Sequence, residues 1–83
     1  MEYIIDYGFE KKRVQTVELI GSPKQITWAN KIRGEILEKI YTNPGTVKSA
    51  KYVTKITSAK WFIEHRNESS AVVVLDAKSA HTR

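Results

Sequence analysis

The chain has 83 residues, and its 14 lysines and arginines against 9 aspartates and glutamates give a formal net charge of +5 and an isoelectric point near 9.6. This length supports one small domain with a modest core and argues against a second one. The absence of cysteine excludes a disulfide framework and thiolate metal ligands. With no signal peptide and no membrane-spanning window expected either, composition favours a soluble cytoplasmic protein.

Two stretches near the N-terminus have the pattern of β-strands. Residues 3–9 place four aromatic or aliphatic side chains at period two: Tyr3, Ile5, Tyr7 and Phe9. Residues 14–20 are rich in β-branched side chains. We expect a hairpin whose loop, residues 10–13, is solvated; its basic residues Lys11, Lys12 and Arg13 can also touch phosphates.

Residues 22–41 predict the central helix of the fold. Ser22, Pro23 and Gln25 form a capping box with proline at the first helical position. The helix should end near Thr42, because the turn sequence Asn-Pro-Gly follows at residues 43–45. At 100° per residue, one face is apolar and should line the core: Ile26, Ala29, Ile32, Ile36, Leu37 and Ile40. Gly34 lies opposite, where it costs about 1 kcal/mol relative to alanine.

Two residues of this helix depart from a simple amphipathic pattern. Arg33 lies inside the apolar stripe, so either its stem packs while the guanidinium reaches water or a carboxylate, or it forms an anion or partner site. Trp28 lies at the margin of the stripe and is either a core-edge aromatic or an interface residue.

The rest of the chain predicts two short helices and a strand. Residues 46–56 favour a helix, with a strand over residues 52–57 as the alternative. Thr57 or Ser58 then caps a helix from residue 59 to about residue 66. Residues 71–75, a continuous apolar run, predict a strand, and residues 76–83 a flexible tail. The expected fold is α+β, a single compact domain over residues 1–75, in which the N-terminal hairpin and the C-terminal strand form a small antiparallel sheet on the central helix.

The positive charge is localised. No acidic residue occurs between Glu38 and Glu64, whereas five lysines do: Lys39, Lys48, Lys51, Lys55 and Lys60. If residues 46–56 are helical, Lys48, Lys51 and Lys55 point the same way. Such a cluster indicates nucleic acid, an acidic protein surface or an anionic membrane as partner.

No catalytic or metal constellation is recognisable in the sequence. The two histidines, His65 and His81, have no nucleophile or ligand partner at a motif spacing, and the glycines are isolated. We therefore expect no enzyme activity, no cofactor and no metal.

Residues 21–33, GSPKQITWANKIR, followed by residues 57–63, TSAKWFI, carry a recurring pattern. The chain thereby resembles small uncharacterised proteins and accessory domains of bacteria, their phages and mobile elements. The resemblance implies an association with mobile DNA, beside DNA-handling or host-interaction proteins, and no activity that transfers residue by residue.

Two functions remain open. The first is a nucleic-acid-associated module, non-specific or structure-directed, in which Lys48, Lys51, Lys55 and Lys60 contact phosphates while Trp61 or Tyr52 stacks on bases. The alternative is a protein-binding or inhibitory module that acts on a host protein, with Trp28 or Trp61 as its anchor. A helix-turn-helix is weaker, since the second helix lacks a base-reading set, and membrane-surface binding is a distant third. The oligomeric state is left open.

Overall fold

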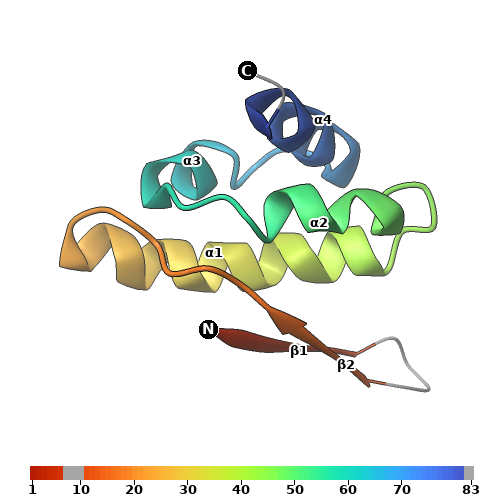
Figure 1. Cartoon of the computed structure of the whole chain (residues 1–83), viewed down its shortest axis with the longest axis horizontal. Helices are drawn as coiled ribbons and strands as arrows, with labels where there is room; N and C mark the ends of the chain where they lie inside the picture. The colour runs from red at the N-terminus through yellow and green to blue at the C-terminus, as the bar shows by residue number, and fades with distance from the viewer. Residues whose placement is uncertain (7–10, 82–83) are drawn as a thin grey trace.

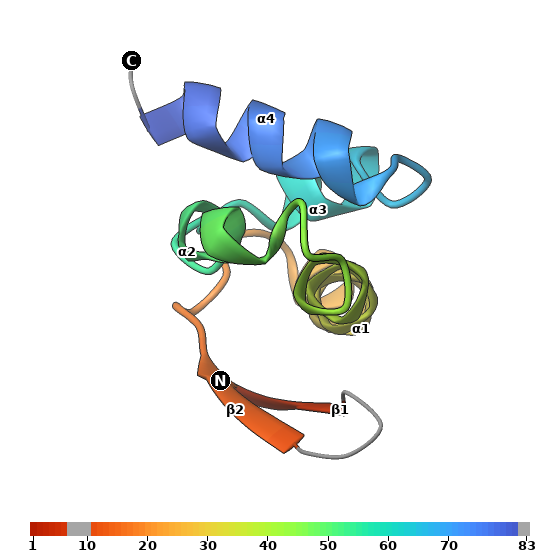
Figure 2. The same cartoon turned by 90° about the vertical axis from the view of Figure 1, so that its right-hand side faces the viewer.

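The chain folds into three layers around one long helix. The computed structural model describes residues 1–6 and 11–81. Its elements are β1 (Glu2–Asp6), β2 (Lys11–Gln15), α1 (Pro23–Tyr41), the 3₁₀ turn η1 (Val47–Ser49), α2 (Ala50–Val53), α3 (Ala59–Glu64) and α4 (Ser70–His81). The hairpin lies on one side of α1, α2 and α3 lie on the other, and α4 covers them (Figure 1). The view along α1 shows the same order (Figure 2). The predicted α+β class is confirmed.

The hairpin has the predicted sidedness but a different extent. Ile5 is buried and Tyr3 half-buried on the side that packs on α1, whereas Ile4 between them is exposed. The other predicted positions of this face, Tyr7 and Phe9, lie outside the described residues. The period-two pattern therefore identified the core side of β1 where the structure describes it.

The second strand begins three residues earlier than predicted. Lys11, Lys12 and Arg13 belong to β2 and not to a loop, because they pair with residues 4–6 of β1. Their side chains are exposed, and Lys12 Nζ lies 5.1 Å from the centre of the Tyr41 ring. Lys11 and Arg13 occupy the solvated face of the strand, which carries charge as readily as a loop does, and Lys12 extends to Tyr41 at the edge of the other face. Charge alone therefore placed this boundary wrongly.

Residues 16–20 were predicted to continue the strand, but only Thr16 still bonds to the hairpin, through Met1 O, and residues 17–20 run beside the α2–α3 connection. The backbone N–H of Ile20 donates to Thr57 O at 2.6 Å, and Ala59 N–H donates back to Ile20 O at 3.1 Å. Leu19 of this segment is buried. The predicted strand therefore ends at Gln15, and only Ile20 forms a further bridge, with Ser58 of the α2–α3 connection.

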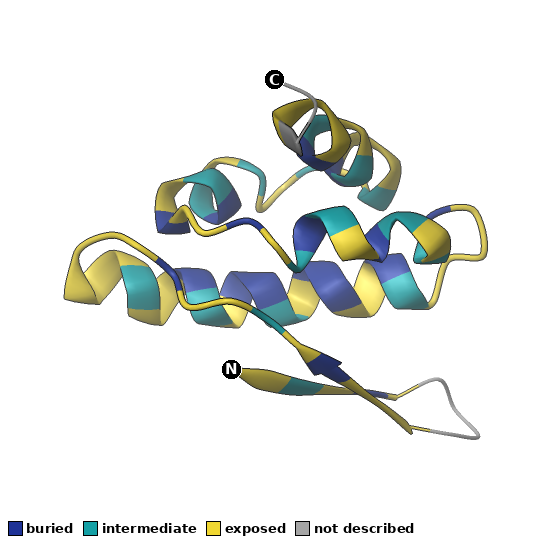
Figure 3. Cartoon of the chain, viewed as in Figure 1, coloured by how far each residue is buried: buried dark blue, intermediate teal, exposed yellow. Residues whose placement is uncertain are grey.

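The predicted start, end and buried face of the central helix are confirmed. Ser22 Oγ accepts from the Gln25 N–H while Gln25 Oε1 accepts from the Ser22 N–H, so the capping box is complete. The C-cap is Thr42, as expected. Of the predicted apolar face, Ile26 is half-buried and the rest is buried: Ala29, Ile32, Ile36, Leu37 and Ile40. Figure 3 shows buried, intermediate and exposed stretches alternating along this helix.

The segment after the turn is helical, as favoured. η1 and α2 occupy residues 47–53, with Ala50 and Val53 buried, and the strand alternative is excluded. Ser58 caps α3, since its Oγ accepts from the Trp61 N–H at 3.2 Å.

The predicted C-terminal strand is wrong, because residues 71–75 lie in α4. Val73 and Ala77, one helical turn apart, are the buried residues of this helix, and α4 packs mainly on α2. A run of valines prefers a strand locally, but helix packing overrides that preference. The sheet therefore has two strands among the described residues. Residues 76–81 of the expected tail are helical, so the compact part extends past residue 75.

None of the helices in the described part of the chain is long and apolar enough to cross a membrane.

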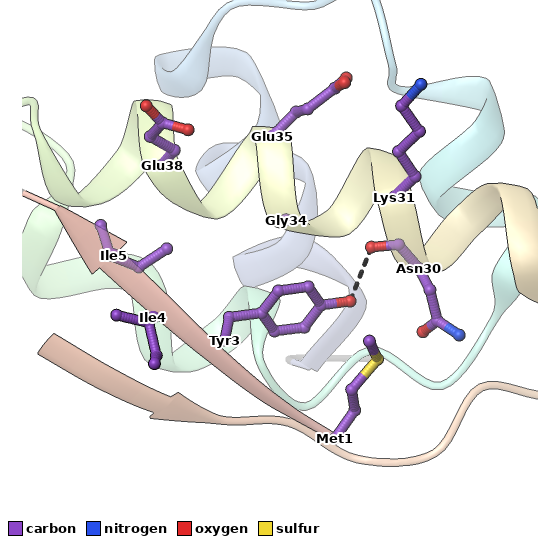
Figure 4. Close-up of a pocket in the computed structure, with 9 residues that line it drawn as sticks. All are labelled: Met1, Tyr3, Ile4, Ile5, Asn30, Lys31, Gly34, Glu35 and Glu38. Carbon is purple, nitrogen blue, oxygen red and sulfur yellow. Dashed lines mark hydrogen bonds between the residues drawn. The ribbon is translucent and has the colours of Figure 1, made fainter.

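Gly34 allows the hairpin to approach α1. A Cβ at this position would lie 3.0 Å from Cε1 and 3.2 Å from Cδ1 of Tyr3. The Tyr3 ring cannot retreat freely, because its hydroxyl donates to Asn30 O at 2.7 Å (Figure 4). Gly34 is therefore a contact position and not the solvent-facing one predicted.

We expect Gly34→Ala to destabilise the protein, although the same change in a free helix gains about 1 kcal/mol. In a Tyr3→Ala background the obstacle is gone, and the substitution should become stabilising. Urea unfolding of the four proteins of this double-mutant cycle measures the reversal. If Gly34→Ala stabilises both backgrounds equally, the close contact has no energetic weight.

Candidate functional site

Arg33 is buried in the interior of the molecule, with 1% of its surface exposed. Its Nε donates to the Tyr3 hydroxyl at 3.0 Å, Nη1 to Val17 O at 2.7 Å, and Nη2 to Asn30 Oδ1 at 3.0 Å. Nη2 also lies 3.9 Å from Met1 Sδ. The guanidinium therefore joins β1, the segment after β2 and α1 through one planar group.

This arrangement differs from the first alternative for Arg33, in which the guanidinium reaches water or a carboxylate. The guanidinium does not reach water, and no carboxylate of the described residues forms an ion pair with it. Its charge is met by neutral oxygens and by two aromatic rings, those of Tyr3 and Phe62, whose centres lie 5.3 and 5.7 Å from Cζ. The hollow that Arg33 lines also contains Glu18 and Asn30 but neither tryptophan.

Trp28 is at the surface, with half of its area exposed. It lines an open, mainly apolar hollow of about 420 Å³ together with Pro23, Lys24, Thr27 and Lys31. Lys24 precedes Trp28 by one helical turn and Lys31 follows it by slightly less, so both flank the ring on the same side of α1. The hollow thus combines an indole surface with two cations.

A third cation reaches Trp28 from the turn after α3. The Arg66 guanidinium carbon lies 5.2 Å from the centre of the indole ring, and Arg66 Nη1 donates to Ile63 O at 2.6 Å. This bond holds the guanidinium on the ring. We call Lys24, Trp28, Lys31 and Arg66 the Trp28 patch.

The lysines singled out from the sequence are all exposed, but they belong to different elements. Lys48 and Lys51 lie on η1 and α2, Lys55 follows α2, and Lys60 lies on α3. None of them forms an ion pair with a described carboxylate. They remain available as cations, on the side of the fold formed by the shorter helices.

Trp61 is not a free stacking surface. It is half-buried, its ring stacks on His65 with centres 4.1 Å apart, and it meets Phe62 edge-on. His65 in turn lies beside two carboxylates, Glu68 and Asp76. The structure therefore gives Trp61 packing partners at the junction of α3 and α4.

The predicted site residues do not form one constellation. Arg33 lies in the interior, Trp28 on the outer side of α1, Trp61 between α3 and α4, and the lysines on the shorter helices. Sequence reasoning missed Lys24, Lys31 and Arg66 as neighbours of Trp28. The first two were detectable from their helical spacing, whereas Arg66 required the packing of α3 on α1.

The fold is that of a small α+β protein in which a two-stranded hairpin and three shorter helices enclose one long helix. Comparison with models of protein families, with curated proteins and with solved structures gives no match.

We expect Arg33→Lys to destabilise the fold by roughly 3 kcal/mol, because one ammonium cannot span three acceptors and leaves buried oxygens unpaired. Urea unfolding monitored by circular dichroism measures this loss. The exposed Arg13→Lys is the matched control and should change stability by less than about 0.5 kcal/mol. Equal, small effects of both substitutions would contradict the role of the buried fork.

Proposed function

We propose that this protein is a non-catalytic module that binds single-stranded nucleic acid through the Trp28 patch. The observation that supports the proposal best is the half-exposed indole, which borders an open hollow among three cations. Proteins that bind single strands combine aromatic stacking surfaces with cations that follow the phosphates.

The placement of Trp28 suits stacking. Trp28 is not packed into the hydrophobic core, and half of its surface is in contact with solvent. The hollow beside the ring is lined by Pro23, Thr27 and the aliphatic parts of Lys24 and Lys31, which present apolar surface. An unpaired base can cover such a surface, whereas a base inside a duplex has no free face to offer.

The surrounding charge suits a phosphate backbone. Lys24, Lys31 and Arg66 carry three positive charges next to the ring. Lys48, Lys51 and Lys55 add a second group of exposed cations on the shorter helices. Because no acidic residue interrupts the chain between Glu38 and Glu64, this second group keeps its charge uncompensated by near neighbours in sequence.

The resemblance to proteins of mobile elements accords with a nucleic-acid partner, since it implies an association with mobile DNA. The alternative, a module that binds an acidic host protein, uses the same cations and the same indole as an anchor. Trp28 is the more suitable aromatic side chain in either case, because Trp61 is packed against His65 and Phe62.

We expect Trp28→Ala to weaken binding to a fluorescently labelled oligothymidine by about 5- to 150-fold, the range that the loss of one stacked base implies. Fluorescence anisotropy at low salt measures the affinity. The same variant should bind a duplex of equal length as weakly as the parent does. If neither protein binds the single strand at low salt, the proposed function is wrong.

Lys24→Ala and Lys39→Ala form a matched pair, because both remove an exposed lysine of α1 but only Lys24 lies in the Trp28 patch. Lys24→Ala should lower the affinity and reduce the dependence on salt, whereas Lys39→Ala should do neither. With about four phosphate contacts, affinity of the parent falls by about 50-fold between 50 and 200 mM salt. Equal effects of the two substitutions would indicate diffuse attraction and no site.

Capture from a bacterial lysate separates the two partner classes. A partner that is retained by the protein after nuclease treatment, and lost in Trp28→Ala, would support the host-protein alternative against nucleic acid.

A further inference from the structure

A second site lies at the junction of α3 and α4, away from the Trp28 patch. His65 Nε2 lies 3.0 Å from Asp76 Oδ2 and 3.8 Å from Glu68 Oε2. One ligand-type atom from each of these residues lies within 4.8 Å of the other two. His65 is mostly buried, with 14% of its side chain exposed, so it is held in place while the two carboxylates border solvent.

The contact of His65 Nδ1 with a backbone carbonyl shows that this ring nitrogen carries a proton. Nδ1 lies 2.7 Å from Trp61 O, and because a carbonyl oxygen only accepts, Nδ1 must donate. In the neutral ring Nε2 then bears a lone pair, which points at a carboxylate oxygen of Asp76. A proton on Nε2, which Asp76 then accepts, or a metal ion bound by both atoms turns this contact into an attractive one.

Glu68 supplies a second observation at this cluster. Its Oε2 is buried and makes no hydrogen bond with any described residue. A buried carboxylate oxygen without a hydrogen bond is costly, and its 3.8 Å contact with His65 Nε2 is too long to be one. A bound cation would remove that cost.

We propose that His65, Glu68 and Asp76 bind a divalent transition-metal ion of the zinc class. One imidazole nitrogen and two carboxylate oxygens are ligands that Zn²⁺ accepts at about 2.0–2.2 Å. Donation from the second ring nitrogen to a backbone carbonyl is the outer contact typical of metal-binding histidines. The imidazole ligand favours such ions over Mg²⁺ or Ca²⁺, which prefer oxygen alone.

The surroundings leave room for further ligands. An open hollow of about 340 Å³ borders the cluster and is lined by Trp61, His65, Asp76, Ser79 and Ala80. Three protein ligands leave at least one coordination position of Zn²⁺ for water or a small anion. The site would also link the turn after α3 to α4, and it would do so whether or not the Trp28 patch binds nucleic acid.

Calorimetric titration of chelator-treated, tag-free protein with ZnCl₂ near neutral pH tests the proposal. We expect saturable one-to-one binding that Glu68→Gln and Asp76→Asn each weaken by at least about tenfold. Glu64→Gln, an exposed glutamate of α3 outside the cluster, is the matched control and should bind as the parent does. His81→Asn should also bind normally, which excludes the other histidine as the ligand.

A second measurement guards against variants that fail to fold. In Trp28→Phe, Trp61 is the remaining tryptophan of the chain. Co²⁺ bound beside His65 should quench the fluorescence of Trp61, because the His65 and Trp61 rings stack with their centres 4.1 Å apart. Absence of saturable zinc binding by the parent, or binding that Glu68→Gln and Asp76→Asn leave unchanged, would overturn the proposal and leave a proton as the cation of this cluster.

Discussion

The buried guanidinium of Arg33 is the contact on which the arrangement of the layers depends. A two-stranded hairpin is marginal by itself and needs a surface to pack on. Arg33 connects that hairpin to α1 through the Tyr3 hydroxyl and, in the same plane, holds Val17 O. The segment that Val17 begins then pairs with residues 57–59 and so fixes the start of α3. The Arg33 side chain thereby fixes the positions of the hairpin, α1 and the start of α3 relative to one another.

This choice of a charged hub has a consequence for the core. A planar group with several donors reaches acceptors on three segments, which an aliphatic side chain cannot do. The contact in turn requires that Tyr3 lie directly on α1, and Gly34 provides the space for it. The buried face of α1 packs against the shorter helices, whereas Trp28 and the cations beside it lie at the surface. We propose that Arg33 and its hydrogen-bond acceptors support the fold, and that the Trp28 patch is the binding surface.

Local signals predicted the local structure well. The capping box at Ser22 and Gln25, the end at Thr42 and the apolar face of α1 depend on neighbours in sequence, and all are present. Tertiary contacts were harder to predict from the sequence. Residues 71–75 have the composition of a buried strand, yet Val73 and Ala77 form one buried helix face, because α4 packs on α2 and α1. Lys11 and Arg13 lie on the outer face of β2, whereas Lys12 pairs with Ile5 on the face toward α1 and extends to the Tyr41 ring.

The same limit applies to the sites. The position of Arg33 in the apolar stripe flagged an unusual residue, but its acceptors come from segments 3 to 30 residues away along the chain. The cluster at His65 was hidden because Asp76 was assigned to a tail, and only its place in α4 brings it to the ring. Spacing could suggest His65 with Glu68 and could not supply the third ligand.

The central proposal is that single-stranded nucleic acid binds at the Trp28 patch, and heteronuclear NMR tests it most directly. In a titration of ¹⁵N-labelled protein with a short oligothymidine, the account predicts that the Trp28 indole N–H signal shifts together with the amides of Lys24, Lys31 and Arg66. The indole signal of Trp61 should stay in place. Shifts that centre on Trp61 and α4, or no saturable shift at low salt, would contradict it.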